Sequence, residues 1–345
     1  MVGCVIVKNS RIIGEGWHHE YGGNHAEIEA INDAKKYNED LRGSTVYVTL
    51  EPCSHYGKTP PCAQRLVSEG VARVIYAMTD PNPKVNGQGL QILRDSGIET
   101  KQANKIFEKQ AKFLNRGFIF LQKYNRPFIT LKAAMSLDGK MCLANNSSKW
   151  ITGIESRTQA HKLRAQNDAV LVGVNTILND DPQLTVRHIR GIDPLRIILD
   201  SNLRTPINSR VISNDNKCLI LTSENADEGK IKSLQDAGAR VAIIESQNNH
   251  INLKSALEYL ITQNVLTLMI EGGPEILSSF LREELADYVN LFIAPKIFGE
   301  GRGFDLRKNF NSVSDAFTLD ISRRTIKRLG DDIFIEGWLS CSRDL

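Results

Sequence analysis

The sequence predicts an α/β protein of two domains, each built on a β-sheet covered by helices. Short apolar, β-branched runs alternate with segments of helical spacing along the chain, which is typical of layered α/β folds. Most apolar runs after residue 127 lack strict alternation, as expected of parallel strands buried on both faces. The length of 345 residues also favours two domains, because one domain commonly has roughly 100–200 residues.

The first half of the chain opens with a predicted β-hairpin. Two short apolar runs flank Asn9 and Ser10, residue types that favour a turn. The helix that begins near Pro60 ends at Gly70, since proline suits the first helical turn and glycine the end. The elements expected after the hairpin are helices over 25–37, 60–70, 89–97 and 105–121 and strands over 44–51, 71–78 and 98–101.

The polar segment Gln122–Pro127 is the best candidate for a linker. Beyond it the apolar runs resume at the spacing expected of a second α/β domain. The expected strands cover 128–135, 169–173, 195–200, 218–222, 240–244, 267–271 and 289–295. We therefore expect two domains, residues 1–122 and 123–345.

Composition excludes several classes of protein. The net charge of +3 is small for this length and gives no support for a nucleic-acid partner. The apolar runs are of strand length, far short of the roughly 20 residues that span a bilayer, so no membrane association is expected. Six dispersed cysteines and the absence of an export signal in the opening residues indicate a reducing, cytoplasmic compartment.

Four residues in the first half have the pattern of a catalytic zinc site. His25 can converge with Glu27 only if His25 lies at a helix start, where Gly22-Gly23 lets the chain turn. Cys53 follows a predicted strand, and Cys62 opens a predicted helix. Three nitrogen and sulfur ligands leave one tetrahedral position of zinc open, and Glu27 is then the acid-base residue. A closed structural site with His55 as fourth ligand is the alternative, but it leaves Glu27 unexplained.

The order His-Ala-Glu, Pro-Cys, Cys resembles the cytidine/deoxycytidylate deaminase superfamily. The segments EPCSHYGKTPPC and DPNPKVNGQG are similar to the first half of a narrower family, the bifunctional riboflavin-biosynthesis proteins. These are diaminohydroxyphosphoribosylaminopyrimidine deaminase/5-amino-6-(5-phosphoribosylamino)uracil reductases. The resemblance implies a cytidine-deaminase-like α/β/α domain holding one zinc ion. It also implies hydrolytic deamination of 2,5-diamino-6-(5-phosphoribosylamino)pyrimidin-4(3H)-one.

The same resemblance implies the residues that contact this substrate. Lys58 and His55 lie in the spacer between the two cysteines, where a cation suits a phosphate. The full implied set is His18, His55, Lys58, Asp80 and Asn82. Members of the family carry a helix and an Asn-Pro loop before the strand that Met1 adjoins here, so we expect a weakened or poorly folded deaminase.

A second site is indicated by TLMIEGGPEILSSFL, which predicts a strand, two glycines and a helix that starts at Pro274. Glycines permit close backbone approach, and a helix N-terminus favours anions such as a diphosphate. Taken alone, this pattern is also that of an ordinary tight turn. No G-x-G-x-x-G follows any strand, so a standard dinucleotide-binding unit is not indicated.

Six further segments occur in the order seen in the reductase half of the same family: LKAAMSLDGK, SKWIT, LRAQNDAVLVGVNTILNDDPQLTVR, LRIILDS, IEGGPE and IAPKIFG. The resemblance implies a dihydrofolate-reductase-like domain that uses NADPH. The implied cofactor contacts are Ala134, Trp150, Thr176, Asp180, Ser201, Gly273, Pro274, Glu275, Ile276, Leu277, Ser278 and Ser279. The implied substrate contacts are Lys132, Ser148, Arg164, Leu184, Arg187 and Glu271. The two arginines suit phosphate, which guanidinium binds in a bidentate manner.

The sequence therefore predicts a cytoplasmic enzyme that deaminates a phosphorylated pyrimidine and then reduces its ribosyl group to ribityl. Its partners are expected to be small phosphorylated pyrimidines and a second copy of the chain, in a homo-oligomer. Two alternatives remain. The first is a nucleic-acid base deaminase fused to an unrelated domain, which would need a basic, aromatic-bearing groove. The second is an active reductase joined to a weakened, dead or purely structural zinc domain.

Overall fold

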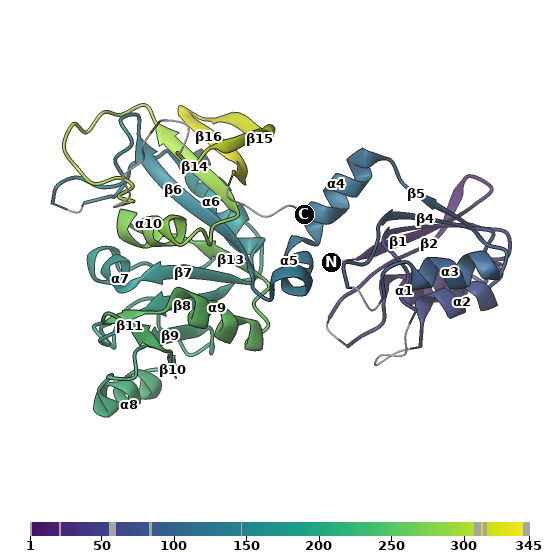
Figure 1. Ribbon diagram of the computed structural model, residues 1–345, viewed down its shortest axis with the longest axis horizontal. Helices are drawn as coiled ribbons and strands as arrows, with labels where there is room; N and C mark the ends of the chain where they lie inside the picture. Colours follow the sequence, from purple (N-terminus) through teal and green to yellow (C-terminus); the bar gives the residue numbers. More distant parts are fainter. Residues whose placement is uncertain are drawn as a thin grey trace. The chain divides into compact units, whose positions relative to one another are not determined.

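The computed structural model describes residues 2–20, 22–54, 60–82, 85–145, 147–306, 312 and 316–340. The chain divides into two compact units, Met1–Tyr124 and Asn125–Asp344 (Figure 1). Each unit has hydrophobic clusters of its own. None of the helices in the described part of the chain has the length and apolar character needed to cross a bilayer.

The first unit is a five-stranded sheet of order β2-β1-β3-β4-β5. Its strands are β1 (Gly3–Lys8), β2 (Arg11–Trp17), β3 (Thr45–Leu50), β4 (Arg73–Met78) and β5 (Glu99–Gln102). Its helices are α1 (Ala26–Lys36), α2 (Cys62–Ser68), α3 (Gln88–Asp95), α4 (Lys105–Leu114) and α5 (Arg116–Tyr124). Strands β3, β4 and β5 are parallel, and β1 is antiparallel to both β2 and β3.

The predicted hairpin turn between β1 and β2 is present, with Asn9 and Ser10 at φ 50° and 60°.

Helix α1 packs against β2 at very close range. A Cβ atom at Gly16 would lie 2.3 Å from the backbone nitrogen of Ala30, and one at Gly14 would lie 2.3 Å from the Ala30 carbonyl oxygen. Only glycine permits this approach. It fixes the N-terminal end of α1, which carries the predicted metal ligand.

The helix expected over 105–121 is in fact two helices. Asn115 ends α4, and its side-chain amide donates to the Ala111 carbonyl oxygen at 3.1 Å. An asparagine side chain that bonds the local backbone competes with continuation of a helix. Helix α5 then runs to Tyr124, so the first three residues of the expected linker Gln122–Pro127 are helical.

The second unit is a nine-stranded sheet of order β10-β9-β8-β7-β13-β6-β14-β16-β15. Its strands are β6 (Phe128–Ser136), β7 (Ala169–Gly173), β8 (Leu195–Leu199), β9 (Cys218–Thr222), β10 (Arg240–Ile243), β13 (Thr267–Ile270), β14 (Tyr288–Ala294), β15 (Leu319–Leu329) and β16 (Asp332–Leu339). A separate two-stranded sheet contains β11 (Ser246–Gln247) and β12 (His250–Ile251). The helices of the second unit are α6 (Ile154–Ala165), α7 (Val174–Asp180), α8 (Glu228–Asp236), α9 (Leu253–Thr262) and α10 (Pro274–Arg282).

Helices cover both faces of this sheet, as the unalternated apolar runs predict. Leu171 of β7 packs in a cluster with α9 and α10, whereas its neighbours Val170 and Val172 pack in a cluster with α6, α7 and α8. Successive strand residues point to opposite faces, so a strand between two helical layers is apolar throughout. All seven strands expected in this unit are present and mutually parallel.

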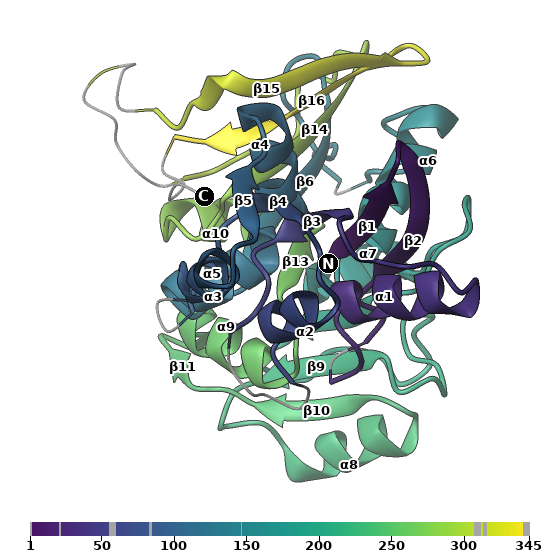
Figure 2. The same cartoon turned by 90° about the vertical axis from the view of Figure 1, so that its right-hand side faces the viewer.

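The sequence reading missed the hairpin of β15 and β16, which pairs antiparallel to β14. Figure 2 shows this hairpin at one end of the sheet and β10 with α8 at the other. The segment that forms β15 is rich in Arg and Lys, which are common on edge strands because they discourage pairing with other chains.

Candidate functional sites

Three of the four residues in the predicted zinc pattern place ligand atoms together in the first unit. His25 is the N-cap of α1, Cys53 follows β3, and Cys62 is the first residue of α2. The His25 Nδ1 atom lies 3.5 Å from the Cys53 Sγ and 3.3 Å from the Cys62 Sγ. All three ligand atoms lie within 4.8 Å of one another. This geometry required His25 at the helix start, as the sequence predicts.

The chemistry of this cluster fits zinc. The hydrogen bond from Cys62 outweighs burial and, together with His25, lowers the pKa of Cys53 to about 4. The hydrogen bond to Cys53 and burial raise the pKa of Cys62. The backbone N–H of Cys62 also donates to the Cys53 Sγ at 3.2 Å. Zinc binds cysteine thiolates and neutral histidine, and it displaces the protons of these groups when it binds. Two sulfurs and one imidazole at this range are such a donor set.

Glu27 lies on the first turn of α1 and is 3% exposed. Burial raises its pKa to about 7. A carboxyl group of this kind, two residues from a ligand, can hold or release a proton beside the metal centre. His18 is also close, because its ring lies edge-on to that of His25 with the centroids 5.7 Å apart. His55 and Lys58 lie outside the described residues, so the closed site with His55 is not tested.

Glu51 is a residue of this site that the sequence reading missed. It is 3% exposed, and its carboxylate accepts the backbone N–H groups of Asp80, Gly87 and Gly89 at 3.2, 3.1 and 3.2 Å. Asp80 in turn accepts the backbone N–H of Asn82 at 2.8 Å. Glu51 therefore ties the segment that carries two predicted substrate residues to the turn that carries Cys53. The signal available in the sequence was its position directly before Pro52-Cys53.

The second unit has a large cavity of about 750 Å³. It lies at the carboxyl ends of β7, β8 and β13 beside β6, where ligands commonly bind in open parallel sheets. Sixteen of the residues expected to bind cofactor or substrate line it: Lys132, Ala134, Ser148, Trp150, Arg164, Thr176, Asp180, Leu184, Arg187, Ser201, Glu271, Gly273, Pro274, Glu275, Ile276 and Ser279.

Leu277 and Ser278 do not line the cavity, contrary to expectation. Both are 0% exposed. Leu277 packs in the core with α9, and the Ser278 hydroxyl accepts the backbone N–H of Asp305 at 2.9 Å. Successive residues of a helix point about 100° apart, so a run of seven contacts along α10 cannot all face one ligand.

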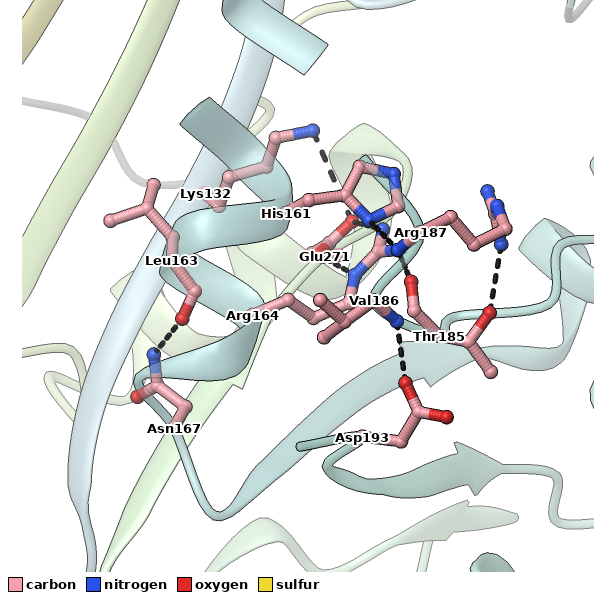
Figure 3. Close-up of polar contacts among 10 residues, drawn as sticks. All are labelled: Lys132, His161, Leu163, Arg164, Asn167, Thr185, Val186, Arg187, Asp193 and Glu271. Carbon is pink, nitrogen blue, oxygen red and sulfur yellow. Dashed lines mark hydrogen bonds and ion pairs between the residues drawn. The ribbon is translucent and has the colours of Figure 1, made fainter. Parts of the chain in front are cut away.

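A buried ion pair forms one wall of the cavity (Figure 3). The Nε and Nη2 atoms of Arg164 each donate to Glu271 at 2.9 Å, and Nη1 donates to the Thr185 carbonyl oxygen at 2.8 Å. The Lys132 Nζ lies 3.9 Å from the same carboxylate. Burial opposes ionisation of Glu271, but Arg164 and Lys132 outweigh it and lower its pKa to about 2.

This pairing bears on the expected role of Arg164. The expectation was a bidentate phosphate clamp, yet the fork of the guanidinium is occupied by Glu271. Arg187 is different. It is exposed on the cavity wall, and within the described residues its Nη1 donates to the neutral side chains of Gln183 and Thr185. Arg187 is therefore the better placed of the two for an incoming phosphate.

The start of α10 fits the diphosphate of a dinucleotide. Gly272 has φ 137°, and a Cβ atom there would lie 2.9 Å from the Thr176 hydroxyl oxygen. A Cβ at Gly273 would meet nothing within 4 Å, so the backbone is open on this side. Pro274 begins the nine-residue helix. The first backbone N–H groups of a helix have no partner within it and favour an anion.

Other residues that line the cavity are polar or aromatic. The Ser148 hydroxyl donates to Asp180 at 3.3 Å, and the Lys149 ammonium donates to the Asp180 carbonyl oxygen at 2.6 Å. Trp150 is 66% exposed, with the Arg157 guanidinium 4.7 Å from its ring centroid. The sequence reading missed Arg157 and also His161 of α6, which both line the cavity.

Comparison with known proteins assigns both units. Residues 127–334 match the family model of the RibD C-terminal domain, and residues 1–78 match that of the cytidine and deoxycytidylate deaminase zinc-binding region. The riboflavin biosynthesis protein RibD of Aquifex aeolicus is 42% identical over 336 residues, which cover 97% of this chain and 90% of the relative. That of Escherichia coli is 36% identical over 349 residues, with coverage of 96% and 91%.

Solved structures give the same result. Acinetobacter baumannii RibD is 36% identical with a TM-score of 0.83, covering 98% of this chain and 92% of that chain. A diaminohydroxyphosphoribosylaminopyrimidine deaminase/5-amino-6-(5-phosphoribosylamino)uracil reductase from Thermotoga maritima is 36% identical with a TM-score of 0.83, covering 97% and 90%. These likenesses confirm the predicted pair of folds, one like cytidine deaminase and one like dihydrofolate reductase.

Proposed function

The chain belongs to the RibD family of riboflavin-biosynthesis proteins, and we propose that its two units catalyse two successive reactions on one pyrimidine. Residues 1–122 deaminate 2,5-diamino-6-(5-phosphoribosylamino)pyrimidin-4(3H)-one with zinc. Residues 123–345 reduce the ribosyl group of the product to ribityl with NADPH. The observation that carries this proposal is the placement of a His/Cys/Cys cluster beside a buried carboxyl group in one unit and a dinucleotide-sized cavity in the other.

In the first reaction water replaces the exocyclic amine of the ring. His25, Cys53 and Cys62 hold zinc, which when bound supplies a Lewis acid that lowers the pKa of water. The Glu27 carboxylate accepts a proton from the water. It then passes protons to the ring nitrogen and the departing amine. The carbon–oxygen bond forms, the carbon–nitrogen bond breaks, and ammonia leaves. Zinc deaminases use a glutamate that is not a ligand in this way.

Substrate binding in the first unit is assigned to the residues around this centre. The His18 ring contacts that of His25, and Glu51 holds the Asp80–Asn82 segment in place. Lys58 and His55 belong to the spacer that both cysteines anchor. We assign the substrate phosphate to Lys58, because a chain tethered at both ends keeps its cation near the metal.

In the second reaction NADPH, when bound, supplies a hydride to the opened ribosyl group. The start of α10 and Thr176 hold the diphosphate, and Trp150 and Asp180 complete the cofactor site. Reduction also consumes one proton, and Lys132 is placed to deliver it. Burial and the charge of Arg164 lower the pKa of Lys132, which makes its ammonium a better acid. Arg187 binds the substrate phosphate.

The test uses the purified full chain with the deaminase substrate, with and without NADPH. We expect deamination without NADPH and the ribityl product with it. Glu27→Gln should keep about one zinc per chain and lose deamination by at least about 100-fold, because removing a general acid-base group costs about 10²–10⁴-fold. It should still reduce the deaminated intermediate when this is supplied.

The results separate the alternatives. Full deaminase turnover in Glu27→Gln would disprove the proton-shuttle role. Reduction of supplied intermediate without any deamination by the unaltered chain would leave an active reductase beside a structural zinc domain. An X-ray absorption spectrum with two sulfurs and two imidazoles would replace the open zinc site by the closed one that includes His55.

A further inference from the structure

Helix α6 contacts the Leu184–Arg187 segment that carries two of the proposed substrate residues. Leu184 is 3% exposed and has φ 55°, a conformation that non-glycine residues adopt only where their surroundings impose it. Arg164 donates to the Thr185 carbonyl oxygen at 2.8 Å, and the Val186 backbone N–H donates to Asp193 at 2.6 Å. The segment is thus held from both sides of its backbone.

The third contact on this segment comes from His161 (Figure 3). Its Nδ1 accepts the backbone N–H of Arg187 at 3.1 Å. The side chain is 5% exposed at the cavity wall, and the ring lies edge-on to that of His188 with the centroids 4.6 Å apart. Burial and the charges of Arg164 and Arg187 lower the pKa of His161 to about 4. The ring is therefore neutral at physiological pH, which an acceptor nitrogen requires.

We propose that His161 is a positioning residue of the second unit, which presets Arg187 for the phosphate of the substrate. The hydrogen bond fixes the peptide of Arg187 one bond from its Cα atom. The fixed backbone restricts the positions that the Arg187 guanidinium can take. Less conformational entropy is therefore lost when it binds phosphate. This inference rests on the proposed function, because it assumes that the second unit binds a phosphorylated substrate.

The alternatives for His161 are direct contact with substrate and proton transfer. A neutral ring whose Nδ1 is occupied by a backbone N–H keeps only its Nε2–H, which can donate but not accept. Substitution by asparagine separates these roles, because its side-chain oxygen lies close to the position of Nδ1 and it has no group at Nε2. His161→Leu removes both the acceptor and the Nε2–H at similar volume.

The experiment measures reduction of supplied deaminated intermediate by the full chain, for His161→Leu and His161→Asn. We expect His161→Leu to raise KM for the phosphorylated substrate about tenfold, equal to about 1.4 kcal/mol, since it leaves a partly buried N–H unpaired. The kcat and the Kd for NADPH should change less than about twofold. KM for the dephosphorylated analogue should also stay within about twofold. His161→Asn should restore most of the KM.

Amide hydrogen exchange gives a second readout that does not depend on turnover. The Arg187 amide should exchange faster in His161→Leu and at the normal rate in His161→Asn. Equal losses in both variants would overturn the proposal in favour of direct contact through Nε2. Unchanged KM in His161→Leu, or equal effects on both substrates, would also overturn it. If the unaltered chain fails to reduce the intermediate, it is the proposed function that fails.

Discussion

Replacement of Glu271 by glutamine tests whether the second unit depends on a buried ion pair. The carboxylate has 9% of its side chain exposed and pairs with Arg164, which has 10% exposed. A pKa that falls from 4.5 to about 2 corresponds to about 3 kcal/mol of stabilisation at neutral pH. Glutamine keeps the shape but leaves a buried guanidinium without its counter-charge, a change that commonly costs 3–5 kcal/mol.

We expect the unfolding free energy of the second unit to fall by about 3 kcal/mol at pH 7. The pKa of Glu271 is lower in the folded protein than in the unfolded chain. Its contribution to stability is therefore complete above the unfolded pKa of 4.5 and is lost as the pH falls toward 2. The difference between Glu271→Gln and the unaltered chain should therefore be constant from pH 7 to pH 5. This difference in unfolding free energy should shrink below about pH 4.5, over the range in which both proteins remain folded.

Calorimetry of the full chain is the assay, and added NADPH identifies the transition of the second unit because only that transition shifts upward. Arg164→Met serves as the matched variant. A double-mutant cycle with Glu271→Gln should show strong coupling, since the two residues share one pair of hydrogen bonds. A loss below about 1 kcal/mol, or additive effects of the two substitutions, would refute the ion pair as a source of stability.

Two further predictions concern the independence of the two units. Cys53→Ser should lower zinc content and abolish deamination while reduction of supplied intermediate stays within about twofold, because the ligands belong to the first unit alone; loss of reduction would show one cooperative unit. A fragment that starts at Asn125 should fold and bind NADPH, since that unit has its own two-sided core; an unfolded fragment by circular dichroism would contradict the division.

The sequence predicted the parallel strands and the zinc ligands well for physical reasons. A strand between two helical layers must be apolar along its whole length, and a ligand set must contain particular residue types at a turn or a helix start. Strand β15 was missed because it is the edge strand of the sheet, and an edge strand can be polar. Strand β16 lies between β14 and β15, and its apolar segment DIFIEGWL carried a strand signal that was overlooked. The break at Asn115 was missed because a side-chain bond to the local backbone, rather than composition, ends the helix there.

The unexpected pairings at the candidate sites have a common cause. Residue type indicates what a side chain can bind, but not which partner already occupies it. Arg164 has the chemistry of a phosphate clamp, yet a glutamate more than a hundred residues away takes its fork. Likewise the partners of Glu51 and His161 cannot be read from the sequence, because they are backbone N–H groups of other segments. Only the fold shows these pairings.

In each unit a buried acceptor secures a segment that carries proposed substrate residues. Glu51 accepts three backbone N–H groups on the Asp80–Gly89 segment, and His161 accepts one on the Leu184–Arg187 segment. Backbone acceptors of this kind fix a segment without using the side chains that meet the ligand. Substitution of either acceptor should therefore weaken substrate binding in its own unit and leave zinc or NADPH in place.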